Sequence, residues 1–416
     1  MARGRGVSRT ACLGTLVEMA PSERTRRAAG LDGLRALAAL SVLCFHVWLY
    51  GFDHPSAIVR DGLFDHVMFE ARLGLVFFFV LSGYLLYRAF ARAALTREGR
   101  VDVRRYARRR AARIVPAYWV ATIGAVALLW GDSGTAGVRL PSASELPLFA
   151  VFGQNYSLDT IMRLNPVTWT LCVEVAFYVL LPLVGVFAWW LGPRAWRVQA
   201  LLVGSLIPLG LVWNQLVHDN GWNIIASKAL PAYLPYFAFG MLLALWSERH
   251  RERGVPALGA PATAVLLVAG FALVGGDAYW HATAAPRAVN TWLAVLADVP
   301  AGLGFALVVG AAVVGTGPAT RWMSVRPLAW VGLVSYGVYM WHVPLILFAR
   351  RIDVLPHAYL PRLLLVIGPV LLVAAASWYL VERPLIAWAA RPRQSRRDRR
   401  RAERHGQSQL EAHAAP

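Results

Sequence analysis

The sequence predicts an all-α fold: a polytopic integral membrane bundle of about ten transmembrane helices, with both termini cytoplasmic. Three observations support this. The 416-residue chain is 57% hydrophobic and only 16% charged, which is less polar than a typical soluble protein. Its apolar residues gather in repeated runs of about twenty, the length at which a helix crosses a bilayer. The arginines between these runs lie mostly on alternate connections.

Ten spans follow one another along almost the whole chain. The third follows a basic stretch that ends at Arg113, and the seventh contains Pro261. The predicted spans are residues 31–50, 71–91, 113–131, 167–191, 198–217, 228–247, 257–275, 291–315, 327–349 and 360–390. They form one membrane domain, 31–390, between a basic N-terminal region, 1–30, and a basic tail, 391–416. The tail lacks periodic apolar residues, so we expect it to be disordered.

The positive charge is distributed unevenly across the membrane. The net charge of +19 is almost all arginine, because Lys228 is the only lysine. The connections on the side shared by both termini hold 30 Lys and Arg, and the opposite connections hold 7. Cytoplasmic loops carry such an excess, so the asymmetry predicts an even number of spans in the plasma membrane. We therefore expect contacts with anionic lipid at the cytoplasmic face and no nucleic-acid partner.

Neither the cysteines nor the N-terminus indicates a secreted or metal-binding domain. The three cysteines form no CxxC and no Cys/His cluster, so we expect neither a disulfide framework nor a metal site. Residues 1–30 contain no apolar core of signal-peptide length. Met19 is an alternative start to Met1, because the residues after it lead directly into the first span.

The first span carries two ionisable groups on one face. Arg35 and His46 are eleven residues apart, which is three helical turns and a rise of about 16 Å. Charged groups inside a membrane usually face the protein interior and mark functional paths. An arginine that snorkels beside Asp32 and a packed histidine would explain each residue alone. Their shared stripe favours a functional site.

Two other spans carry polar groups in their outer halves. Glu174 lies in the fourth span, where it needs a partner and could belong to a structural ion pair or to an active site. His342 shares a helical stripe with Ser335 and Tyr339, which indicates a cavity wall or a packed core. His46, Glu174 and His342 lie at similar predicted depth, and a histidine beside a carboxylate can form a general-base site.

Further candidates lie in the middle of the membrane and at the inner end of the bundle. Ser82 is followed by Gly83, a pair that allows close helix packing unless a base activates the serine as a nucleophile. Glu382 and Arg383, near the end of the last span, favour a structural pair. The densest charge cluster suits either lipid headgroups or the phosphates of a nucleotide or CoA; it comprises Arg104, Arg105, Arg108, Arg109, Arg110 and Arg113.

The chain resembles the acyltransferase 3 family of integral membrane acyltransferases. The family signature is Arg or Lys, ten residues and then His in the first span, which Arg35 and His46 match. Five further motifs follow in the family's order between about residues 30 and 390: FFFVLSGYLL, RRRAARIVPAYW, TWTLCVEVAFYVLLPL, SYGVYMWHVPL and VERPL. The family often has two adjacent acidic residues in the fourth span, but Val175 follows Glu174 here, and Thr170 replaces a common Ser. The chain resembles the stand-alone type, without an appended esterase-like domain.

The resemblance implies acyl transfer, usually of acetyl, from acyl-CoA to a hydroxyl, commonly on a sugar. The family's acceptors include surface polysaccharide, peptidoglycan, lipid-linked sugars and macrolide sugars. Acyl-CoA is a substrate, and no permanent cofactor is expected. The alternative is a transporter or flippase for glycans or small molecules, which would also need charges inside the membrane.

The predicted mechanism uses both ends of the Arg35–His46 stripe. The inner arginines would hold the phosphates of acyl-CoA, and its thioester arm would extend outward along the first span. His46 would act as the general base, with Glu174 or another polar group orienting its ring. His342 or Tyr339 would donate to the oxyanion. An acyl-enzyme on His46 or Ser82 is the less favoured route.

Overall fold

A computed structural model describes residues 23–52, 62–97, 99–132, 134–283 and 295–391. These residues are almost entirely helical, and their only β-type pairing is one isolated bridge, Leu258 to Gly315. The α-helices are α1 (Glu23–Leu49), α2 (Leu63–Glu70), α3 (Gly74–Thr96), α4 (Val103–Leu129), α5 (Leu146–Ala150), α6 (Trp169–Leu191), α7 (Trp196–Gly204), α8 (Leu206–Asp219), α9 (Ile224–Ser227), α10 (Leu230–Glu252), α11 (Ala260–Thr283), α13 (Val299–Val314), α14 (Arg326–Leu333), α15 (Ser335–Arg351), α16 (Tyr359–Ser377) and α17 (Arg383–Ala390).

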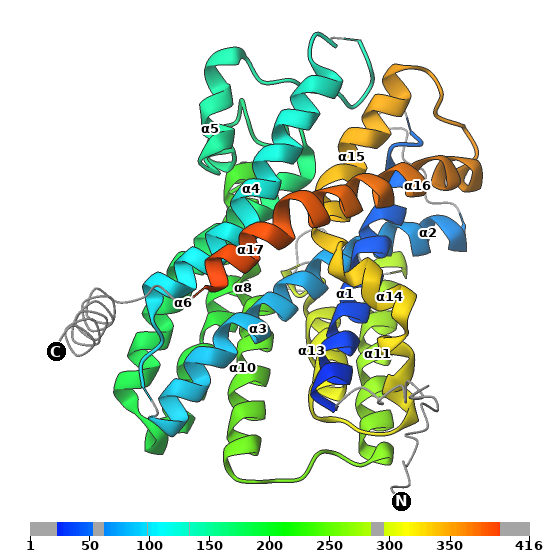
Figure 1. Cartoon of the computed structure of the whole chain (residues 1–416). Coiled ribbons are helices and arrows are strands. Elements are labelled where there is room, and N and C mark those ends of the chain that lie inside the picture. Colours follow the sequence, from blue (N-terminus) through cyan, green and yellow to red (C-terminus); the bar gives the residue numbers. More distant parts are fainter. Residues whose placement is uncertain (1–22, 53–61, 98, 133, 284–294, 392–416) are drawn as a thin grey trace, which may run out of the picture.

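Short helical turns join or extend these helices. The 3₁₀ turns are η2 (Ala71–Leu73), η3 (Ala143–Glu145), η4 (Gln154–Tyr156), η5 (Pro166–Thr168), η6 (Pro193–Ala195) and η8 (Pro318–Ser324). One π-helical segment, η9 (Trp378–Glu382), joins α16 to α17. Figure 1 shows these three segments as a long, tilted rod that crosses the other helices.

The predicted membrane bundle is confirmed in the described part of the chain. Eight helical segments are long and apolar enough to cross a membrane, and the bent pair α14–α15 makes a ninth. The remaining predicted span, 291–315, corresponds to α13, an apolar helix of 16 residues. The start of α1 and the ends of α3 and α10 lie at one end of the bundle (Figure 1). We call this the inner end, because the sequence predicts that it faces the cytoplasm.

Several predicted boundaries differ from the observed ones. The third span begins at Val103 and not at residue 113, because Asp102 caps the helix by accepting from the backbone N–H of Arg105. The seventh begins at Ala260 and continues to Thr283, with Pro261 in its first turn, where a proline costs no helical hydrogen bond. The tail beyond residue 391, residues 1–22 and both candidate start methionines lie outside the described residues.

The core forms where α3 packs against α6, α10 and α13. Phe237 of α10 stacks on Phe177 of α6 with ring centroids 3.9 Å apart, and it also contacts Phe79 of α3. A Cβ atom at Gly83 would overlap the carbonyl of Phe237. The predicted packing role of the Ser82–Gly83 pair is therefore correct for the glycine, and the serine side chain has a different partner.

Candidate functional site

His46, in the last turn of α1, meets His342, in the middle of α15. Nε2 of His342 lies 3.1 Å from Nδ1 of His46, although the two residues are 296 positions apart. His342 is buried, and His46 is half-buried. The ring of Tyr50, just beyond α1, stacks over His46 at 6.2 Å; burial raises the pKa of Tyr50 to about 12, so its hydroxyl stays protonated.

The hydrogen bonds assign the protonation pattern of this pair. Nδ1 of His46 lies 2.9 Å from the carbonyl of Val42, and Nδ1 of His342 lies 3.0 Å from that of Val338. A carbonyl only accepts, so each Nδ1 carries the hydrogen. Nε2 of His342 then accepts from the same Nδ1–H of His46, which it shares with the carbonyl of Val42. This arrangement leaves Nε2 of His46 with a free lone pair, the form that a base requires.

A second part of the site is a cavity of about 110 Å³ toward the inner end of the bundle. Three arginines, Arg35, Arg110 and Arg113, line it together with Ser82, Thr170, Glu174, Tyr178, Ser335, Tyr336, Tyr339 and apolar residues. This volume suits the narrow end of a ligand and not a whole nucleotide. The predicted polar stripe on α15 therefore does form part of a cavity wall, through Ser335 and Tyr339.

Glu174 lies in this cavity and not with the histidines. Its carboxylate accepts hydrogen bonds from Ser82, at 2.8 Å, and from Tyr178, at 3.1 Å. The predicted convergence of Glu174 with His46 and His342 is therefore wrong, because equal depth along a helix does not determine which neighbour its side chain faces. The side chain from another helix that hydrogen-bonds to the ring of His46 is His342.

The arginine cluster of α4 divides into two sets. Arg110 and Arg113 lie one turn apart and face the cavity, whereas Arg104, Arg105 and Arg109 are exposed. The side chain of Arg108 donates to the backbone carbonyl of Arg391 at 3.3 Å. Within the described residues, Arg110 and Arg113 make no close ion pair, and the Nε of Arg110 is buried without a hydrogen-bond partner. Arg35 donates to Asp32 at 2.8 Å.

Tyr339 links the cavity to the histidine pair. Tyr339 and Phe78 line the cavity, and their rings contact each other at 6.0 Å. The Tyr339 ring also lies 5.7 Å from that of His342. The Tyr339 hydroxyl contacts Thr170 Oγ1 at 2.8 Å and the carbonyl of Val167 at 3.2 Å, so its hydrogen already has acceptors.

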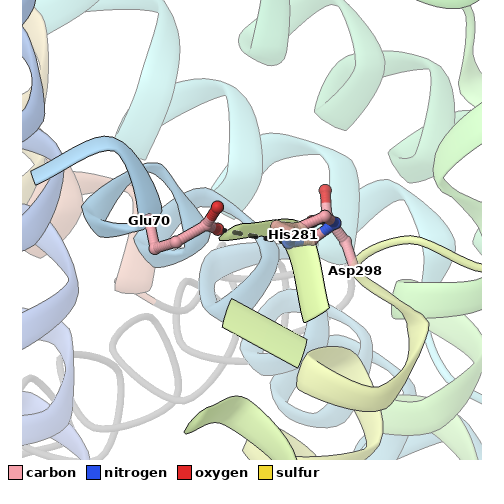
Figure 2. Close-up of side chains that lie close together, drawn as sticks. All are labelled: Glu70, His281 and Asp298. Atoms are coloured by element: carbon pink, nitrogen blue, oxygen red, sulfur yellow. Dashed lines mark ion pairs between the residues drawn. The ribbon is translucent and has the colours of Figure 1, made fainter. Parts of the chain in front are cut away.

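Sequence reasoning missed a charge cluster in the outer half of the bundle. Figure 2 shows Glu70, His281 and Asp298 pointing toward one another. Arg72 contacts all three: it binds the carboxylate of Asp298 through two nitrogens, at 2.8 and 2.9 Å, and approaches Glu70 at 3.2 Å and His281 at 3.4 Å. The guanidinium thus already supplies a cation between these groups.

The sequence does contain a signal for this cluster, but the seventh span was predicted to end before it. Asp277 and His281 are four residues apart, so they share a helix face. The predicted seventh span ended at residue 275, which placed both in a loop. In the structure α11 continues to Thr283, and both side chains are buried.

Comparison with known proteins supports the resemblance seen in the motifs. A family model described as an acyltransferase domain matches residues 28–382. The chain is similar to the O-acetyltransferase OatA of Staphylococcus aureus, at 24% identity over 86% of this chain and 57% of that protein. It is also similar to the peptidoglycan O-acetyltransferase OatA of Listeria monocytogenes, at 25% over 85% and 55%. The putative peptidoglycan O-acetyltransferase YrhL of Bacillus subtilis is 23% identical over 86% and 54%.

The chain spans little more than half the length of these curated relatives. No solved structure matches it.

Proposed function

The chain belongs to the membrane acyltransferase family that its sequence motifs indicated, and we propose that it transfers an acyl group, expected to be acetyl, from acyl-CoA to a hydroxyl of a sugar. The carrying observation is that Tyr339 lines an arginine-lined cavity and also contacts His342, the partner of His46, whose Nε2 has no hydrogen-bond partner among the described residues. The names of the similar proteins support acetyl as the group and a glycan as the acceptor. Lipid-linked sugars and glycosylated metabolites are the other acceptors of this class.

The residues that line the cavity favour a donor with negative charge. Three guanidinium groups face it, and Arg110 and Arg113 keep their donors free of close carboxylate partners within the described residues. Unpaired charges in the interior of a membrane protein are costly, so a ligand that brings negative charge would stabilise them. Arginine binds phosphate through paired, charge-assisted hydrogen bonds. The phosphates of acyl-CoA would lie at the inner edge of the cavity, against these guanidinium groups, and the thioester arm would enter the cavity.

In the proposed chemical step, His46 removes the proton of the acceptor hydroxyl. Nε2 takes the proton as the hydroxyl oxygen bonds to the carbonyl carbon of the thioester. The carbon–sulfur bond then breaks, and the proton passes from His46 to the sulfur, which leaves as free CoA thiol. General-base catalysis of this kind contributes about 10²–10⁴-fold to a rate.

His342 replaces Glu174 as the group proposed to orient the base. Its Nε2 accepts from Nδ1 of His46, which holds the ring and stabilises the imidazolium that forms during the step. Since both nitrogens of His342 are engaged, it is a positioning residue and not an oxyanion donor. In this mechanism the rings of Phe78 and Tyr339, which are in contact, move apart to let the thioester reach His46.

The test compares cells that carry the wild-type chain, His46→Ala, or the exposed-histidine control His357→Ala. Surface glycans and secreted glycosides are analysed by mass spectrometry, and release of free CoA from acetyl-CoA is measured in isolated membranes. In cells with His46→Ala, we expect the glycans or glycosides to lack the acyl mass. The rate of CoA release should fall about 10²–10⁴-fold, although the amount of chain in the membrane equals that of the wild type. Wild-type rates in the His46→Ala membranes would exclude this mechanism.

A further inference from the structure

The last turn of α1, which carries His46, leaves one backbone carbonyl without a backbone partner. In a helix that continued, the carbonyl of Val47 would accept from the N–H of Gly51. The N–H of Gly51 donates instead to the carbonyl of Trp48, at 3.0 Å. Among the described residues no other backbone N–H reaches Val47. The end of this helix therefore needs a donor from elsewhere in the molecule.

Arg362 of α16 supplies the missing donor. Its Nη1 donates to the carbonyl of Val47 at 3.0 Å, although the two residues are 315 positions apart. The same guanidinium donates to the carbonyl of Pro356 through Nε, at 2.9 Å, and to that of His357 through Nη2. Arg362 is 5% exposed, and no carboxylate within 4 Å pairs with it among the described residues. Three carbonyls thus fix its orientation, and its charge lies at the negative end of the α1 dipole.

A second arginine holds the chain just beyond this turn. Nη1 of Arg350, on α15, donates to the carbonyls of Tyr50, at 3.4 Å, and Phe52, at 3.2 Å. The guanidinium of Arg362 packs so closely that a Cβ atom at Gly51 would overlap its Nη1. The end of α1 is therefore anchored from two neighbouring helices, and the Arg362 contact requires glycine at position 51.

The anchored turn determines where the ring of His46 lies. His46 immediately precedes Val47, and its Nδ1 lies within 3.1 Å of both the carbonyl of Val42 and Nε2 of His342. The ring of Tyr50, whose carbonyl Arg350 holds, stacks over that of His46. Helix ends fray when nothing holds them. A reacting group displaced by about 1 Å can lose about 10²-fold in rate.

We propose that Arg362 is a positioning residue for the base: it fixes the last turn of α1 so that the Nδ1–H of His46 stays on Nε2 of His342 while Nε2 of His46 faces the acceptor hydroxyl. This inference rests on the proposed function. Arg362 does not line the arginine-lined cavity, so its loss should slow the chemical step and leave donor binding unchanged.

The experiment measures the rate of CoA release at saturating acetyl-CoA in isolated membranes, divided by the amount of chain present. The Kd of acetyl-CoA and thermal unfolding are measured on purified chain in lipid nanodiscs. The variants are Arg362→Gln, Arg362→Lys, His46→Ala and the double variant His46→Ala with Arg362→Gln. Arg351→Gln is the matched control, because Arg351 also donates to a carbonyl near a helix end, that of Leu128 in α4, at 2.6 Å.

We expect Arg362→Gln to lower the rate about 10–100-fold and to change the Kd of acetyl-CoA by less than about twofold. Arg362→Lys should lose less, because it keeps one donor for Val47 but not the fork that reaches three carbonyls. It carries the same comparison if Arg362→Gln does not fold. In the double variant, Arg362→Gln should add no further loss to His46→Ala. Arg351→Gln should keep the wild-type rate.

Two outcomes overturn the inference. If His46→Ala abolishes transfer but Arg362→Gln and Arg362→Lys both keep the wild-type rate, the positioning role is wrong and the proposed function stands. If Arg362→Gln lowers the rate equally with and without His46, Arg362 does not act through the base. A wild-type rate in His46→Ala would instead overturn the proposed base, and this inference with it.

Discussion

The inner cavity and the outer charge cluster both place arginine inside an apolar bundle, but the charge of the arginine is balanced differently in each. In the outer cluster, Arg72 contacts Asp298 through two nitrogens and also reaches Glu70 and His281. In the inner cavity, Arg110 and Arg113 line the wall without a close ion pair among the described residues. Arg35 is intermediate, since it pairs with Asp32 and lines the same cavity.

The difference separates structural charges from charges available to a ligand. A guanidinium that carboxylates surround has little left to offer a substrate, and its removal leaves them unpaired. A guanidinium that faces a cavity leaves no carboxylate orphaned when it is removed, but the ligand loses a partner. The outer cluster should therefore control stability, and the inner cavity should control donor affinity.

The largest expected effect is in the outer cluster. Arg72→Ala leaves the carboxylates of Asp298 and Glu70 without their cation, and breaking such a pair costs about 3–5 kcal/mol. Thermal unfolding in detergent should therefore shift strongly downward, while the chain that remains folded keeps its affinity for acetyl-CoA. Arg249→Ala removes a surface ion pair to Glu252 and serves as the control, with an expected loss below about 1 kcal/mol. Similar losses in the two variants would contradict the structural role of the cluster.

The next largest effect concerns the inner cavity. Arg110→Ala should weaken acetyl-CoA binding by about 10–100-fold, because a hydrogen bond to a charged group is worth about 1.5–3 kcal/mol. Thermal stability should be unchanged, since Glu174 keeps its bonds from Ser82 and Tyr178. Titration calorimetry and thermal unfolding on the same sample separate the two quantities. A large loss of stability with normal binding would place Arg110 with the structural charges.

The smallest effect is expected from the exposed arginines of α4. Replacing Arg104 and Arg109 together by Ala should change acetyl-CoA affinity by no more than about twofold. Because each basic residue near an anionic lipid surface contributes about 1 kcal/mol, the stabilisation by anionic over neutral nanodiscs should decrease. Thermal unfolding in both lipid compositions measures this. If this double variant lost as much affinity for acetyl-CoA as Arg110→Ala does, the whole arginine cluster of α4 would bind the donor.

The candidate site was predictable in part. The spacing of Arg35 and His46 placed one residue at the cavity and the other in the histidine pair, because both positions follow from the geometry of one helix. The stripe through Ser335, Tyr339 and His342 was predictable for the same reason. Glu174 was misassigned, since its partners Ser82 and Tyr178 depend on how α6 packs against α3.

The sequence by itself determined the membrane class, the succession of spans and the separation of Arg35 and His46 along the first of them, because apolar length and the rise per residue are properties of one helix. Only the tertiary structure decided that His46 meets His342, that Arg110 and Arg113 face a cavity while Arg109 does not, and that Arg72 closes the outer cluster. These contacts join helices that are distant in sequence. Their pairing depends on the packing of close-fitting surfaces such as Gly83 on Phe237, which no periodicity within a single span records.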